Sequence, residues 1–105
     1  MSRKDNPVSE TEESVKTKKT VIEPPLYRVL IHNDDYTAMD FVVDVLMMVF
    51  KKSDSEATHI MLNVHRKGIG ICGIYTHEVA ETKVETVHSL AAENGYPLKC
   101  TMEKE

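Results

Sequence analysis

The sequence predicts an α+β fold: a single small two-layer α/β sandwich with the element order β-α-α-β-α-β. Short stretches in which apolar residues alternate are separated by longer stretches in which apolar residues recur at helical spacing. Turn and capping signals mark the points where the strand-like alternation changes to helical spacing, or the reverse. A chain of 105 residues has room for one such domain, so we expect one sheet with helices covering one of its faces.

The first strand is predicted over Leu26–His32, with Tyr27, Val29 and Ile31 on one face. Pro24-Pro25 cannot donate to a ladder of strand hydrogen bonds, so we place the domain boundary there and expect residues 24–105 to fold. Residues 1–23 are rich in Ser, Thr, Glu and Lys and show no repeated apolar face. They are therefore predicted to be a disordered N-terminal extension.

The first helix is predicted from Ala38 to about Phe50. Thr37, followed three places later by Asp40, resembles a capping box at its start. The helix is unusually apolar, because Asp40 and Asp44 are its only polar residues. Either it is a central helix packed on two sides, or part of its apolar surface lines a ligand pocket; both can hold for different faces.

The later elements have clear start and stop signals. Ser53 and Glu56 form a second capping signature, which opens a helix that runs to about Lys67 and stops at Gly68. The remaining elements are predicted as a strand over residues 70–76, a helix over residues 77–93 and a final alternating strand over residues 98–103.

Composition excludes several classes of partner. The formal charge is −4, and residues 24–105 carry all of it without a basic stripe, which argues against nucleic acid. No apolar run approaches the ~20 residues of a membrane span. Cys72 and Cys100 form no C-x-x-C motif and fall in strand-like segments, which is typical of buried free thiols in a reducing compartment. We expect a cytoplasmic protein, monomeric, with neither nucleic-acid nor membrane partners.

No motif predicts catalysis, a cofactor or a metal. His59 and His65 are six residues apart, which places them on different faces of a helix, and there is no H-E-x-x-H motif. Gly68, Gly70 and Gly73 fit a dinucleotide-binding pattern, but they follow a helix and enter a strand, the reverse of the required context. We therefore predict a binding module that is not an enzyme.

The candidate site lies where Asn33-Asp34-Asp35 meets the apolar helix. These residues are also common in structural turns. However, two carboxylates and a carboxamide above Met39 and Val42 would suit a ligand with a positive head and an apolar body. His65, next to Val64 and one turn after Met61, is a possible neighbour or a structural core histidine. Glu78, Glu81 and Glu85 form either a solvated helix face or a docking surface.

Six segments together resemble the ClpS family, the bacterial adaptors of the ClpA-type AAA+ unfoldase of the ClpAP protease. The resemblance covers nearly all of residues 24–105, in order. The segments are Asn33-Asp34-Asp35-Tyr36-Thr37-x-Met39, Phe41-Val42-Val43-Asp44-Val45-Leu46, Met61-Leu62-x-Val64-His65, Ile71-Cys72-Gly73, Glu78-Val79-Ala80-Glu81-Thr82-Lys83-Val84 and Pro97-Leu98-x-Cys100-Thr101.

The resemblance implies an adaptor that binds N-degrons, substrates whose first residue is Leu, Phe, Tyr or Trp, and delivers them to ClpA, modulating its substrate choice. It implies that Asn33, Asp35 and His65 hold the substrate's α-amino group, while Asp34 and Thr37 shape the site. Met39 would act as a gate against β-branched first residues. The implied pocket comprises Met39, Val42, Met61, Val64 and Leu98, and the implied unfoldase-docking residues are Glu78, Glu81 and Lys83.

Two departures from the family pattern concern affinity only. Ala38 stands where proline is frequent, and Arg66-Lys67 add two cations after His65. Two other functions compete with the adaptor hypothesis. One is a small acid-base or metal-dependent enzyme that uses His65 with Asp34 or Asp35, and the other is an interaction domain that uses only the acidic third helix.

Overall fold

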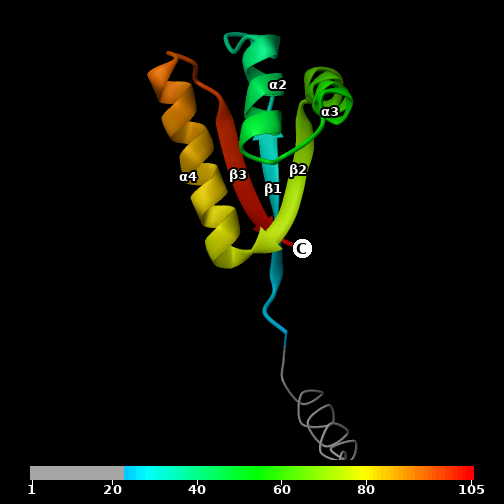
Figure 1. Ribbon diagram of the computed structural model, residues 1–105, viewed down its shortest axis with the longest axis vertical. Helices are drawn as coiled ribbons and strands as arrows, with labels where there is room; N and C mark the ends of the chain where they lie inside the picture. The colour runs from blue at the N-terminus through cyan, green and yellow to red at the C-terminus, as the bar shows by residue number, and fades with distance from the viewer. Residues whose placement is uncertain (1–22) are drawn as a thin grey trace, which may run out of the picture.

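The computed structural model describes residues 23–105 (Figure 1). Residues 1–22, which make up nearly all of the predicted extension, lie outside the described residues. The order β-α-α-β-α-β is confirmed. The elements are β1 (Leu26–His32), α2 (Met39–Met48), α3 (Asp54–Lys67), β2 (Ile69–Thr76), α4 (His77–Glu93) and β3 (Lys99–Lys104).

The three strands form one antiparallel sheet in the order β2-β1-β3, so the first strand is central. Side chains alternate between the faces along β1. Val29 and Ile31 are fully buried on the face that carries the core, whereas Arg28 pairs with Glu103 on the other face. In Figure 1, α2 lies over one end of β1, with α3 beside β2 and α4 beside β3. The predicted two-layer arrangement is therefore confirmed.

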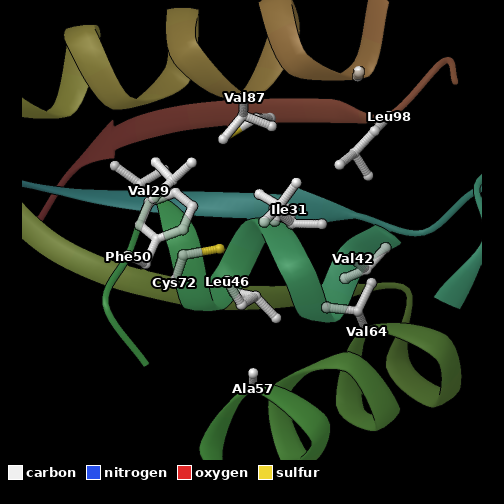
Figure 2. Packing of buried hydrophobic residues seen from close by; sticks show 14 of the residues in the cluster. Val29, Ile31, Val42, Leu46, Phe50, Ala57, Val64, Cys72, Val87 and Leu98 are labelled. Carbon is white, nitrogen blue, oxygen red and sulfur yellow. The ribbon is translucent and has the colours of Figure 1, made fainter. Parts of the chain in front are cut away.

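The core lies between the sheet and the helices. Figure 2 shows Val87 of α4 reaching toward the strand residues Val29 and Ile31, and Leu46 of α2 belongs to the same buried cluster. Cys72 and Cys100 are buried in the same cluster as free thiols, as predicted for the two cysteines. Burial raises the pKa of both thiols, and that of Cys100 reaches about 12.

The start of α3 confirms the predicted capping box. The Ser53 hydroxyl accepts a hydrogen bond from the Glu56 N–H at 3.2 Å, and the Glu56 carboxylate accepts one from the Ser53 N–H at 3.0 Å. The hydrogen bonds that the Glu56 carboxylate accepts from the Ser53 N–H and from the Ser53 hydroxyl hold the pKa of this carboxyl below its usual value. Gly68 ends the helix in the left-handed conformation, at φ 90°.

The predicted capping box at Thr37 is wrong. The N-cap of α2 is Ala38, whose side chain has no group for a capping bond, and the Thr37 hydroxyl donates to Asp34 at 2.6 Å. The helix also stops at Met48, before the predicted Phe50. It is closed by the Lys52 N–H, which donates to the Leu46 carbonyl at 3.1 Å.

Candidate functional site

One cavity of about 130 Å³ opens where the loop after β1 meets α2 and α3. It brings together side chains from four separate stretches of the chain. All ten residues predicted for ligand binding line it, and their binding roles remain predictions. The lining residues are Asn33, Asp34, Asp35, Thr37, Met39, Val42, Met61, Val64, His65 and Leu98, together with His32.

Asp34 organises the loop at the mouth of the cavity. One of its carboxylate oxygens accepts hydrogen bonds from the N–H groups of Tyr36 and Thr37, at 2.8 and 2.9 Å. The other accepts the Thr37 hydroxyl. A short Asx side chain that bonds the backbone two and three residues ahead fixes a turn locally. Asp34 therefore fixes this turn, whereas the Asp35 carboxylate accepts no side-chain hydrogen bond within residues 23–105.

Asn33, Asp35 and His65 surround the mouth with polar groups that are free to bind. Within residues 23–105, no side-chain hydrogen bond engages any of the three, and all three are exposed. The Asn33 N–H donates to the Gly68 carbonyl at 2.9 Å, which ties this loop to the turn that follows His65. Two exposed acceptors and an imidazole at one opening can satisfy the protons of an ammonium group.

The wall and floor of the cavity are apolar. Val42, Val64 and Leu98 are 7%, 3% and 5% exposed, and Figure 2 shows Val42 on α2 close to Val64 on α3. Met39 is 43% exposed at the rim, where an unbranched thioether side chain can change rotamer readily. The apolar first helix thus has two kinds of surroundings: Val45 and Leu46 are core, whereas Met39 and Val42 line the cavity.

The site depends on close packing behind Val64. A Cβ atom added at Gly70 would lie 2.6 Å from a Val64 methyl carbon. Only glycine lets β2 approach α3 closely enough to hold Val64 in the cavity wall. Glycines in a strand often mark such approaches, and this is the structural use of one glycine from the rejected dinucleotide motif.

His32 is the one lining residue that the sequence prediction missed. Its Nε2 atom lies 2.7 Å from the Thr101 hydroxyl of β3. Burial, followed by the nearby Lys99 ammonium, lowers the pKa of its imidazole. The position of His32 as the last residue of a strand, directly before Asn33, was the only signal that could have pointed to it.

The predicted docking residues have different environments on α4. Glu78 and Glu81 are exposed one turn apart, as is Glu85. Lys83 is half-buried, and its ammonium donates to the Val49 carbonyl at 2.8 Å. The same ammonium lies 5.3 Å from the ring centroid of Tyr75. Lys83 thus supplies a cation at the end of α2, whose own last turn has no basic residue.

Two further findings concern residues 23–105 only. No cluster of three or more His, Cys, Asp or Glu side chains among them is arranged to hold a metal ion. None of their helices combines the length and the apolar character needed to cross a bilayer.

The fold and the cavity define a class of protein: a small α/β domain with a cavity that is apolar at its base and polar at its mouth. Residues 22–101 match the family described as "ATP-dependent Clp protease adaptor protein ClpS". A ClpS from Desulfatibacillum aliphaticivorans is 60% identical over 95 residues, which cover 90% of this chain and 88% of that relative. One from Desulforapulum autotrophicum is 63% identical over 92 residues, 88% of each chain.

A solved structure is also similar. Agrobacterium tumefaciens ClpS2 bound to L-phenylalaninamide superposes with a TM-score of 0.77 at 38% identity, over 79% of this chain and 100% of that one. The present chain therefore belongs to the ClpS family of ATP-dependent Clp protease adaptor proteins, and the predicted resemblance is confirmed. An adaptor of this kind is not itself the protease.

Proposed function

We propose that this ClpS-family protein binds the free α-amino group and the large hydrophobic first side chain of N-degron substrates and delivers them to a ClpA-type unfoldase. The observation that carries the proposal is the cavity itself. Unengaged polar groups of Asn33, Asp35 and His65 surround the mouth of an apolar pocket. Phenylalaninamide, the ligand of the Agrobacterium relative, combines a free amino group with a large apolar side chain.

The polar mouth is suited to an ammonium ion. Asp35 supplies a negative charge, and the Asn33 carbonyl and an unprotonated His65 nitrogen supply neutral acceptors. Charge-assisted hydrogen bonds of this kind are stronger than neutral ones. An acetylated amino terminus has lost its charge and two of its donors, and it would leave these groups poorly satisfied.

The apolar base selects the first side chain by size. An engineered apolar cavity of about 150 Å³ accepts benzene, so a cavity of about 130 Å³ accommodates a Leu side chain or a Phe ring. Tyr and Trp are larger and require Met39 to move outward. We infer that Met39 also disfavours β-branched first residues, whose second branch at Cβ would meet it at the rim. Burial of a Leu or Phe side chain contributes about 1.5–3 kcal/mol.

A binding titration tests the proposal. Fluorescent peptides of one sequence, with first residue Leu, Phe, Val or Met, are compared with their N-acetylated forms. Leu and Phe peptides with a free amino group should bind, and acetylation should remove binding. Equal affinity for free and acetylated peptides would overturn the proposal and leave the interaction-domain hypothesis. Turnover of peptides or model esters, dependent on His65, would instead support the competing enzyme hypothesis.

We further propose that Glu78, Glu81 and Lys83 dock on the N-terminal domain of the unfoldase, and that the N-terminal extension assists delivery. The exposed carboxylates of α4 suit a basic partner surface. Glu81→Lys should weaken the unfoldase complex while leaving peptide affinity unchanged, and Glu93→Lys near the far end of α4 is the matched control. We expect the adaptor to act as a cytoplasmic monomer.

A further inference from the structure

The face of the sheet opposite the core carries an uncovered apolar stripe. Strand register places its members side by side on β1 and β2, because Leu30 pairs with Ile71 and Arg28 pairs with Ile74. Four of them rank among the exposed large apolar residues of the described chain. We call this stripe the open face; its exposed residues are Leu26 (42%), Ile69 (41%), Ile71 (52%) and Ile74 (44%), and Leu30, the register partner of Ile71, lies on the same face but is buried (7% exposed).

A groove deepens the open face at one end. It lies between α3 and β2, and its volume is about 380 Å³. Its walls are mainly apolar, with a lysine and an asparagine at the side. The lining residues are Leu30, Ile60, Asn63, Lys67, Ile69, Gly70 and Ile71. A contiguous apolar patch with a groove and a polar border is typical of an interaction surface.

The charge around the open face is positive, although the protein as a whole is acidic. Arg28 is paired with Glu103 at 3.2 Å. Lys67, in the groove, and Lys99, on β3, form no ion pair with any residue between 23 and 105. A second copy of this chain would bring the same free cations to the contact, which is unfavourable. An occupant with apolar residues and carboxylates fits better.

We propose that the occupant is the segment of the same chain from Val8 to Val15, V-S-E-T-E-E-S-V. It supplies three carboxylates for the free cations and two valines for the apolar stripe. Residues 23–25 lead into Leu26, which is the first member of the open face. The inference is independent of the proposed degron pocket, which lies at the loop after β1 and faces α2 and α3.

The chain is long enough for this contact. Val15 and Leu26 are eleven positions apart in the chain, which corresponds to about 36 Å when it is extended. From Leu26 to the level of His32 the open face is six residue steps of strand long, about 20 Å. Linkage to the sheet also gives the segment a local concentration on the order of millimolar, so a weak contact is populated without a separate partner.

Paramagnetic relaxation in the full-length protein tests the proposal. A nitroxide is attached at Ser9→Cys, which reacts selectively because Cys72 and Cys100 are buried. Methyl signals of Ile69, Ile71 and Ile74 should broaden more than those of Val79, which is also exposed but lies on α4. Lys67→Glu should lower the occupied population roughly two- to fivefold, the scale of an exposed ion pair. Lys104→Glu makes the same change of charge outside the groove and should leave the occupied population unchanged.

Three results would overturn the proposal. Broadening that is absent from the open face, or equal on Val79 and Ile71, would show that the segment has no preferred site there. Broadening seen when spin-labelled protein is mixed with isotope-labelled protein without a nitroxide would assign the face to a second copy. Broadening that is unchanged in Lys67→Glu would show that the contact does not depend on charge complementarity, which is the ground for choosing this segment.

Discussion

Asp35→Ala separates ligand recognition from folding more cleanly than any other single change at the mouth of the cavity. Asp35 is exposed and receives no side-chain hydrogen bond within residues 23–105, so its removal should leave the midpoint of unfolding nearly unchanged. Loss of a hydrogen bond to a charged group costs about 1.5–3 kcal/mol. This range corresponds to a roughly 10- to 150-fold weaker Kd for a peptide that begins with Leu or Phe.

The assay is fluorescence anisotropy with such a peptide, accompanied by thermal unfolding of every variant. Asp44→Ala is the matched control, because it removes the same charge from an exposed site on α2 that does not line the cavity. Asp34→Ala should behave differently, since it removes three hydrogen bonds from the loop and should lower both stability and affinity. The assignment of Asp35 to the amine would be refuted by a Kd within twofold of the Asp44→Ala value.

Three further predictions concern other parts of the molecule. Gly70→Ala should cost about 1–3 kcal/mol of stability and weaken peptide binding, because the new methyl displaces Val64 from the cavity wall. Denaturant unfolding measures the stability and fluorescence anisotropy measures the peptide Kd; if neither changes, the packing argument is contradicted. Cys72 and Cys100 should react with a disulfide reagent at pH 8 only after denaturation, because a thiol with a pKa of about 12 is on the order of one part in 10⁴ ionised; rapid labelling of native protein would show that they are accessible. The folded-state pKa of His32 lies below its usual 6.5, so the unfolded chain binds more protons than the folded protein as the pH falls. The free energy of unfolding should therefore decline from pH 6.5 downward through the pKa of the folded state, and it should decline less steeply in His32→Gln. Urea unfolding at several pH values measures this, and an equal pH dependence in the two proteins would refute it.

The order of elements could be predicted from the sequence because local signals agreed with one another. Ser53, Glu56 and Gly68 each fix a helix end through bonds within a few residues, and the structure contains those bonds. The start of α2 was predicted wrongly because Thr37 had two local partners of similar chemistry. Asp34, three residues before it, accepts both the N–H and the hydroxyl of Thr37, and a sequence pattern cannot rank that turn against a capping box.

The lining of the cavity was predictable only in part for a related reason. Helical periodicity placed Met39 near Val42, and Met61 near Val64 and His65, but periodicity does not bring one helix to another. Their convergence, together with Leu98 from the segment before β3, depends on the tertiary fold. The sequence pattern offered His65 only as a possible neighbour of the site, and the resemblance to ClpS then joined the sets. The structure now joins them by geometry, without using any relative.

Lys83 shows what sequence patterns do not report about a residue that is predicted to be functional. From the sequence it was one charge on an acidic helix face, grouped with Glu78 and Glu81 by resemblance alone. In the structure its ammonium holds the end of α2 at the Val49 carbonyl and lies against the ring of Tyr75. A lysine has three donors, so Lys83 can keep this internal bond and still present protons to a partner. Loss of docking in a Lys83 variant would therefore not identify a direct contact, whereas the exposed Glu81 has no such internal role within residues 23–105.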